Sequence, residues 1–232
     1  MNGLRLGSRT GGMGWSSPTP VEPEAGNWSS VASLNPKQYV VPPPPANDSA
    51  ETRAELEQLR RITRNLTPAD LPRMRRWSVE EKTVLTHWST MADEMCRTYR
   101  LSSPAGARVQ ALLAGGVNTA LIACWNNKYL YLRPRPTMLD PSITAVLGVP
   151  DHPSYPAGHP TVAGAASRIL KQFFPQDSAT FQDMTVDNGL FRLQAGAHFM
   201  SDIRAGVFLG HRVAGDILAA EARSGAPMRY SR

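Results

Sequence analysis

Two histidines and three basic side chains in the second half of the chain have types and spacings that suit chemistry on a tetrahedral oxyanion. In chain order, the residues concerned are Lys128 and Arg135-Pro136, then Pro156-Ala157-Gly158-His159, then Arg192, His198 and Asp202. Arginine offers a planar fork that matches oxyanions, and lysine offers a compact point charge. Histidine adds proton transfer and nucleophilicity. We therefore predict an enzyme that acts on a phosphate-sized anion.

The segment from Pro156 to His159 predicts a glycine turn that leads into a helix. Gly158 lets the backbone approach an anion, and the free amides of the first helical turn point at it. His159 would then stand beside the anion, placed to give a proton to a leaving oxygen. Taken alone, the segment also fits a loop histidine with a structural hydrogen bond.

Asp202 follows His198 by four residues, which on a helix places both side chains on one face. The carboxylate can then bind one ring nitrogen and leave the other as a lone-pair nucleophile. A purely structural His–Asp pair is the alternative.

For Lys128 and Arg135 the alternative to anion binding is a solvated basic loop, and we expect Arg133 to lie in such a loop, exposed to solvent. His152 is a further candidate for lining the mouth of the site.

The three segments resemble the type 2 phosphatidic acid phosphatase superfamily, which contains bacterial acid phosphatases, lipid phosphatases and vanadium-dependent haloperoxidases. Its pattern is Lys, six residues, Arg-Pro; then Pro-Ser-Gly-His; then Ser-Arg, five residues, His, three residues, Asp. The chain matches it at Lys128, Arg135 and Pro136, at Pro156, Gly158 and His159, and at Arg192, His198 and Asp202. It departs from the pattern at Ala157 and Phe191, where the family has serine.

The resemblance implies that His198 is the nucleophile, His159 the general acid and Asp202 the partner of His198. The phosphate would be bound by Lys128, Arg135, Arg192, Gly158 and Ala157, with no metal required. In a haloperoxidase, vanadate would occupy the same pocket at His198. The missing serine hydroxyl at Ala157 removes one hydrogen bond to the anion, worth about 1.5–3 kcal/mol for a charged partner, and we expect activity to be retained.

Three functions follow from this reading. The first is a phosphatase that hydrolyses phosphate monoesters or diphosphates through a phosphohistidine, without a cofactor. The second is a vanadate-dependent haloperoxidase, and the third is a catalytically weakened anion-binding protein. The expected partner is a small phosphate ester or diphosphate rather than nucleic acid, because no aromatic residues alternate with the basic run around residues 60–76.

Helical periodicity dominates from Ala50 onward, and no clear alternating strand pattern occurs. We expect an all-α helical bundle of the acid phosphatase/vanadium haloperoxidase type, whose loops carry the polar residues. A capping box, Ser78 with Glu81, predicts the start of the second helix. The expected helices cover residues 50–66, 78–99, 109–125, 161–173 and 201–223.

Three segments are expected along the chain. Residues 1–50 are rich in Gly, Ser and Pro and predict an extended arm, which Trp15 and Trp28 could anchor. Residues 51–223 form the catalytic domain, and 224–232 a tail. The net charge of +6 favours anionic partners.

Cys96 and Cys124 predict buried reduced thiols, with a disulfide or metal pair as the alternative. No apolar run reaches the roughly 20 residues that cross a bilayer, and the first residues lack the apolar core of a secretory signal. We therefore expect a cytoplasmic protein without a transmembrane segment. A homodimer is plausible for an apolar bundle with a long arm.

Overall fold

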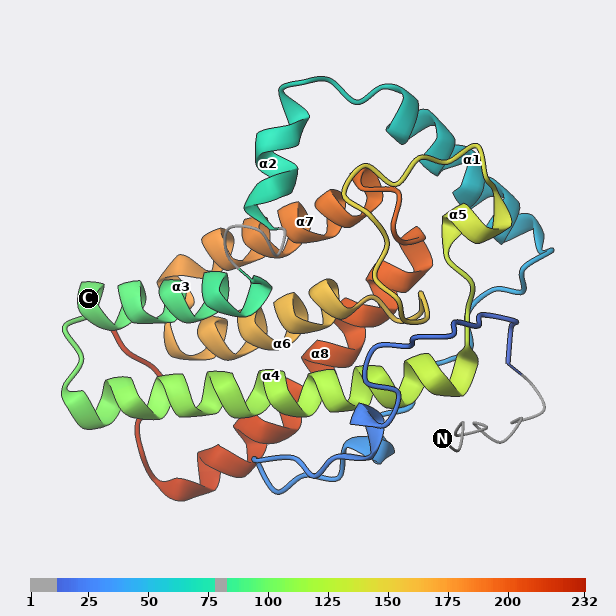
Figure 1. Cartoon of the computed structure of the whole chain (residues 1–232). Coiled ribbons are helices and arrows are strands. Elements are labelled where there is room, and N and C mark those ends of the chain that lie inside the picture. Colours follow the sequence, from blue (N-terminus) through green and yellow to red (C-terminus); the bar gives the residue numbers. More distant parts are fainter. Residues whose placement is uncertain (1–11, 78–82) are drawn as a thin grey trace.

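The computed structural model describes residues 12–77 and 83–232, and every regular element among them is helical. The elements α4 (Ser103–Tyr131), α6 (Gly158–Phe173) and α8 (Met200–Glu221) form the centre of the bundle. Around them lie α1 (Ala50–Arg64), α2 (Asp70–Arg76), α3 (Val84–Thr98), α5 (Pro136–Leu139) and α7 (Ser178–Gln194) (Figure 1). The predicted all-α fold is confirmed, whereas α2 and α7 were not expected.

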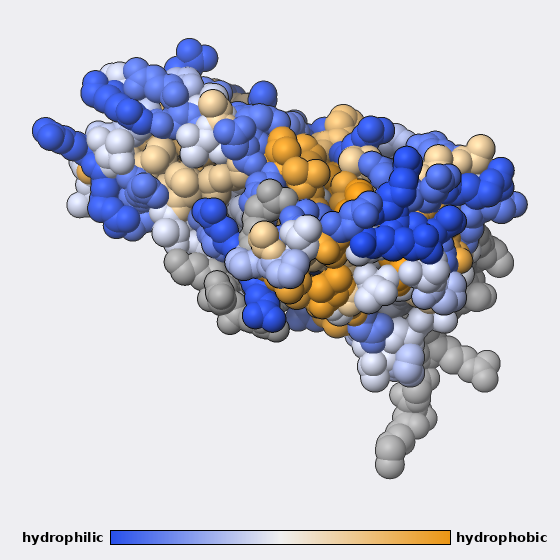
Figure 2. Space-filling model, turned by 90° about the horizontal axis from the view of Figure 1, so that it is seen from above, coloured by the Kyte–Doolittle hydropathy of each residue, from blue (hydrophilic) through white to orange (hydrophobic). Residues whose placement is uncertain are grey.

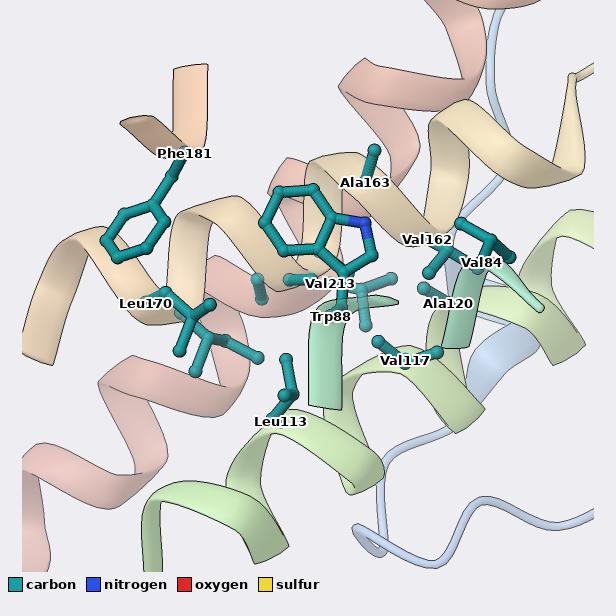
Figure 3. Packing of buried hydrophobic residues seen from close by; sticks show 14 of the residues in the cluster. Val84, Trp88, Leu113, Val117, Ala120, Val162, Ala163, Leu170, Phe181 and Val213 are labelled. Carbon is teal, nitrogen blue, oxygen red and sulfur yellow. The ribbon is translucent and has the colours of Figure 1, made fainter. Parts of the chain in front are cut away.

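The core forms where α3, α4, α6, α7 and α8 meet. Trp88 of α3 lies at its centre, among aliphatic side chains of α4 and α6 (Figure 3). Val84, Ala92 and Met95 are buried on the same side of α3. The expected capping box at residues 78–81 lies outside the described residues, and Thr83, whose hydroxyl accepts a hydrogen bond from the Thr86 amide, caps α3 instead.

Glycines let α6 and α8 approach backbone to backbone. A Cβ atom added at Gly206 would lie 2.5 Å from the Ala157 carbonyl oxygen, and one at Gly210 would lie 2.2 Å from that of Thr161. No side chain larger than hydrogen fits at these distances. This close contact holds the N-terminal ends of both helices side by side, and those ends carry His159 and Asp202.

The central helix α4 is 29 residues long, which is longer than the apolar run predicts. The segment Ser103–Leu139 is long and apolar enough to cross a membrane by length and composition, and 56% of its most apolar window is buried inside the protein. Burial of this extent is typical of the central helix of a bundle, which packs here against α3, α6 and α8.

Residues 12–49 run along the end of α4 and contain only two short 3₁₀ turns. Trp15 is buried and packs edge-on against Tyr129, while Trp28 is 52% exposed. The Val41 amide donates to the Asn127 side chain, so the polyproline segment begins against α4. Of the two predicted anchors, only Trp15 is buried.

One side of the molecule carries α1, α2 and α7 together with the loop 140–157 (Figure 1). Seen from this side, the surface is mostly hydrophilic with an apolar area near its middle (Figure 2). On α7, Val186 and Leu190 are 49% and 43% exposed. The loop that carries the second motif thus crosses the same side of the bundle.

Candidate active site

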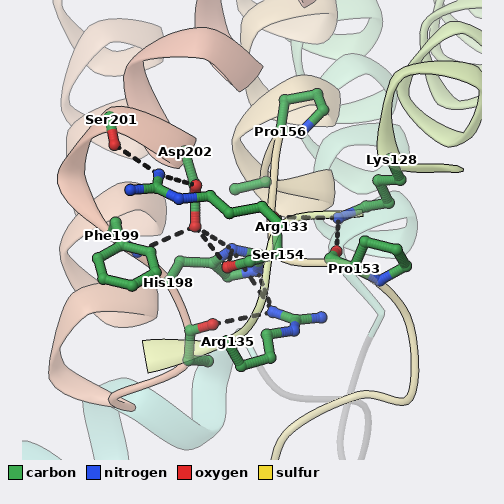
Figure 4. A network of polar contacts seen from close by, with 12 residues as sticks. Lys128, Arg133, Arg135, Pro153, Ser154, Pro156, His198, Phe199, Ser201 and Asp202 are labelled. Carbon is green, nitrogen blue, oxygen red and sulfur yellow. Dashed lines mark hydrogen bonds and ion pairs between the residues drawn. The ribbon is translucent and has the colours of Figure 1, made fainter. Parts of the chain in front are cut away.

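The first motif lies at the point where α4 ends. Leu132 adopts a left-handed conformation (φ 51°), its amide donates to the Lys128 carbonyl, and Pro134 prevents the helix from continuing. The chain turns sharply here, so that Arg133 and Arg135 both point back into the protein (Figure 4).

Lys128 is completely buried, with its ammonium bound by backbone carbonyls. The Nζ atom donates to the carbonyl oxygens of Pro153 at 2.6 Å and Ser154 at 3.2 Å. Burial, followed by the charges of Arg135 and Arg192, lowers the pKa of Lys128 to about 7. The side chain is therefore a fixed donor whose charge responds to pH near neutrality.

Arg135 is also buried, and it contacts His198 directly. Its Nη1 atom lies 2.9 Å from His198 Nε2 and donates to the Ala197 carbonyl at 2.8 Å. On the other branch, Nη2 lies 3.0 Å from His152 Nδ1, and the His152 ring packs on Trp125 at 4.9 Å. Burial lowers the pKa of Arg135 to about 9. The structure thus places His152 against the guanidinium rather than at an outer mouth.

His198 and Asp202 form the predicted pair, with His198 Nδ1 3.3 Å from Asp202 Oδ2. The geometry differs from the expected one, because α8 begins at Met200 and His198 lies in the preceding loop. The contacts assign the tautomer: Nδ1–H faces the carboxylate and the Nε2 lone pair faces Arg135. Burial and the charges of Arg135, Arg192 and Lys128 lower the pKa of His198, so the ring is neutral.

Besides His198 Nδ1, three donors bind the Asp202 carboxylate. Its Oδ2 atom accepts from the Ser154 hydroxyl at 2.5 Å and from the Phe199 amide at 3.0 Å, and Oδ1 accepts from Arg133 Nη1 at 2.6 Å. The carboxylate is fully buried. These donors fix the orientation of the carboxylate independently of His198, so the carboxylate can in turn orient the histidine ring.

Arg192 lies near the end of α7, close to a turn at Gly196. This glycine has φ 68°, and a Cβ there would come 2.8 Å from the Thr144 carbonyl oxygen, so the turn requires glycine. Arg192 is buried, its Nε has no hydrogen-bond partner, and no hydrogen bond from its guanidinium is found within residues 12–77 and 83–232. Burial lowers its pKa to about 10. An unpaired buried cation of this kind is suited to an anionic ligand.

His159 lies in the first turn of α6. Its Nε2 atom is 3.1 Å from the Trp77 carbonyl oxygen, and its ring meets Phe191 edge-on at 5.7 Å. Burial, followed by the charge of Arg192, lowers the pKa of His159 to about 3. Phe191 also lies 4.9 Å from the Arg192 guanidinium, so the residue that replaces the family serine contacts both groups.

Gly158 and Ala157 begin α6 as the glycine turn predicts. The Ala157 side chain is fully buried in an apolar cluster with Leu193, Phe199 and Ile203, and it provides no cap to the helix. A Cβ at Gly158 would only touch Trp125 at 3.7 Å, so space alone does not require glycine there.

The three motifs converge, since Arg135 contacts His198 at 2.9 Å and the Ala157 amide donates to the Asp202 carbonyl at 3.0 Å. Sequence reasoning missed Ser154 and misjudged Arg133. The prediction that Arg133 occupies a solvated loop is wrong: the side chain is fully buried and ion-paired. The position of Arg133 between Lys128 and Arg135, directly before Pro134, was the sequence signal that could have indicated its burial.

Two aspartates in the segment between the first two motifs have structural partners. Asp140 pairs with Arg60 at 2.6 Å, and Asp151 accepts from the hydroxyls of Ser17 and Thr19. Both cysteines are free thiols; Cys124 is buried and Cys96 is partly exposed. Within the described part of the chain, no three His, Cys, Asp or Glu side chains form a group that could hold a metal ion.

Comparison with known proteins supports the grouping of these motifs. Residues 109–222, which contain all three, match the model of the PAP2 superfamily. The chain belongs to the PAP2 superfamily. No curated protein matches it.

Solved structures of this superfamily share the fold. The chain is similar to a bacterial vanadium-dependent iodoperoxidase (TM-score 0.76, 23% identity, 88% of this chain and 60% of the other). It is also similar to a holo-type bacterial vanadium-dependent chloroperoxidase (0.70, 15%, 88% and 55%). A transmembrane PAP2-type phosphatidylglycerolphosphate phosphatase from Bacillus subtilis matches less closely (0.56, 15%, 77% and 90%). The chain thus spans little more than half the length of the two peroxidases.

Proposed function

We propose that the protein is a phosphatase that hydrolyses phosphate monoesters or diphosphates through a phosphohistidine. The observation that carries the proposal is the two-sided environment of His198. Its Nδ1 faces Asp202 at 3.3 Å, and its Nε2 faces a buried cation, Arg135, at 2.9 Å. A neutral imidazole so held keeps its lone pair on Nε2, beside a cation that could transfer its hydrogen bond from the ring to a bound anion.

In the first step, His198 Nε2 attacks phosphorus and the bond to the ester oxygen breaks. His159 gives its proton to the leaving oxygen. Water then attacks phosphorus while His159 takes a proton from it; the phosphorus–nitrogen bond breaks, its electron pair returns to His198 Nε2, and phosphate leaves. Lys128, Arg135 and Arg192 stabilise the charge on the transferred group, and this electrostatic effect is the main source of catalysis in such transfers.

The low pKa of His159 bears on its role as an acid. In the absence of an anion, burial and the charge of Arg192 keep this histidine neutral above a pH of about 3. A bound dianion offsets the charges of the arginines and favours protonation of His159. Substrate binding would therefore convert His159 into its protonated, acidic form, so that the protein takes up a proton when it binds the substrate.

The test is hydrolysis of p-nitrophenyl phosphate by the purified protein in the presence of EDTA. We expect metal-independent turnover, because three cationic side chains supply the positive charge. His198→Ala should abolish turnover, whereas His211→Ala, on the outer part of α8, should leave it unchanged. Equal turnover by the wild-type protein and His198→Ala would falsify the proposal.

A second candidate, a vanadate-dependent haloperoxidase, is favoured by the likeness to the iodoperoxidase, which covers 88% of this chain. The unpaired Nε of Arg192 and the buried cations Lys128 and Arg135 suit vanadate as well as phosphate, with His198 Nε2 as its ligand. Bound vanadate would supply activation of hydrogen peroxide for halide oxidation. Iodination or bromination with vanadate and peroxide, and no ester hydrolysis, would establish this candidate. Tight vanadate binding with neither activity would identify an anion-binding protein.

A further inference from the structure

Arg133 is a buried cation that touches none of the residues assigned to the anion. Its Nη1 atom donates to Asp202 Oδ1 at 2.6 Å and to the Ser201 hydroxyl at 2.7 Å, and Nη2 lies 3.3 Å from Glu55 Oε2. The guanidinium lies 4.0 Å from the centre of the Phe199 ring. It therefore spans two carboxylates that come from different helices, Asp202 of α8 and Glu55 of α1; Figure 4 shows its contacts with Asp202 and Ser201.

Glu55 connects this arrangement to α1. Its Oε1 accepts from the Ser201 amide at 2.6 Å, and its Oε2 accepts from the Ser201 hydroxyl at 2.9 Å. The carboxylate thus binds the first turn of α8, where a negative charge is favourable. One face of α1 is in this way joined to the start of the helix that carries Asp202.

The division of the Asp202 oxygens is the central point. Arg133 occupies Oδ1, so that Oδ2 is left for His198 Nδ1, the Ser154 hydroxyl and the Phe199 amide. Arg133 meets the carboxylate through one N–H, at Oδ1, and this charge-assisted contact acts with the two donors at Oδ2 to fix how Asp202 faces the histidine.

We propose that Arg133 is a positioning residue. Because it is bound to Glu55, it holds the Asp202 carboxylate in a fixed orientation, and the carboxylate in turn keeps His198 in the tautomer with a proton on Nδ1. The role in turnover rests on the phosphatase function proposed above. The effect on the tautomer does not, because it exists in the protein without substrate. The two ideas can therefore fail separately.

The experiment compares Arg133→Met and Arg133→Lys with the wild-type protein. The His198 ring nitrogens are observed by ¹H–¹⁵N NMR, and p-nitrophenyl phosphate kinetics are measured in parallel. In Arg133→Met we expect a mixture of His198 tautomers and a kcat lowered about 10- to 100-fold, as is typical when a supporting partner is lost. KM should change little, because the anion-binding cations remain. Arg133→Lys should fall between the two.

Arg60→Met is the matched control, since it breaks another ion pair of α1, that with Asp140 at 2.6 Å. It should leave the tautomer and kcat unchanged. A single wild-type His198 signal in folded Arg133→Met overturns the proposal. If Arg133→Met does not fold, the Arg133→Lys variant provides the test. A wild-type His198 NMR signal and a wild-type kcat in Arg133→Lys would then overturn the proposal. A mixed tautomer in a protein without phosphatase activity would leave the positioning role standing and remove only the proposed function.

Discussion

The two sides of the His198 ring have opposite surroundings. On the Nε2 side lies Arg135, and the charges of Arg192 and Lys128 also act on the ring; Arg192 has no hydrogen-bond partner in residues 12–77 and 83–232. On the Nδ1 side, Asp202 is fully hydrogen-bonded and paired with Arg133. Unpaired charge is costly in a protein interior. The Nε2 side therefore favours a ligand, whereas the Nδ1 side is complete without one.

The largest expected effect comes from removing the carboxylate on the Nδ1 side. Asp202→Asn keeps the shape but allows the His198 ring to take the wrong tautomer, and kcat should fall by up to about 10⁴-fold. Hydrolysis of p-nitrophenyl phosphate measures the loss. Asp216→Asn is the control, since Asp216 lies on the same helix and accepts a hydrogen bond from the Tyr39 hydroxyl rather than from a histidine. Activity of Asp202→Asn within tenfold of wild type would contradict the contrast drawn between the two sides.

Among the cations whose charges act on His198, Arg192→Gln removes the one without a hydrogen-bond partner. The loss in kcat/KM should be about 10²- to 10³-fold, as for one donor that stabilises an oxyanion. Stability should be retained, because the guanidinium has no hydrogen bond to lose. Arg97→Gln, which breaks an exposed ion pair with Asp93, should have no effect on kinetics. Unchanged kinetics in Arg192→Gln would show that Arg192 does not bind the anion.

The pH dependence of anion binding sharpens the same contrast. The pKa of Lys128 is about 7, so its ammonium is charged below that pH and neutral above it. Sulfate keeps its charge over this range, and its affinity should fall by up to about tenfold per pH unit above 7. Calorimetry would measure the trend, which should be weaker in Lys128→Met. A flat profile from pH 6 to 9 would mean that Lys128 does not contact the anion.

The smallest effect concerns Ala157. A serine there can cap α6 through the His159 amide, since Ala157 gives no cap, and we expect a gain of about 1 kcal/mol in the free energy of unfolding. Urea denaturation measures it. kcat/KM should stay within about threefold of wild type, because the hydroxyl enters an apolar cluster with Leu193 and Phe199. A gain in kcat/KM above tenfold would show that the missing hydroxyl limits anion binding.

The sequence predicted those parts of the site whose signal is local. The spacing of Lys128 to Arg135 and of His198 to Asp202 indicated side chains that the fold brings together, and periodicity located α1, α4, α6 and α8. Arg133 could not be told from Arg135 because its partners, Asp202 and Glu55, are 69 and 78 residues away. The helix α7 was missed because its apolar side chains surround the helix, so that Phe181 is buried while Val186 and Leu190 are exposed.

The glycine contact between α6 and α8 limits how the protein can respond to a substrate. Because Gly206 and Gly210 leave no room for even a methyl group, these helices cannot slide or open without a large loss of contact. Any change of shape around His159 and Asp202 must then come from elements other than this helix pair.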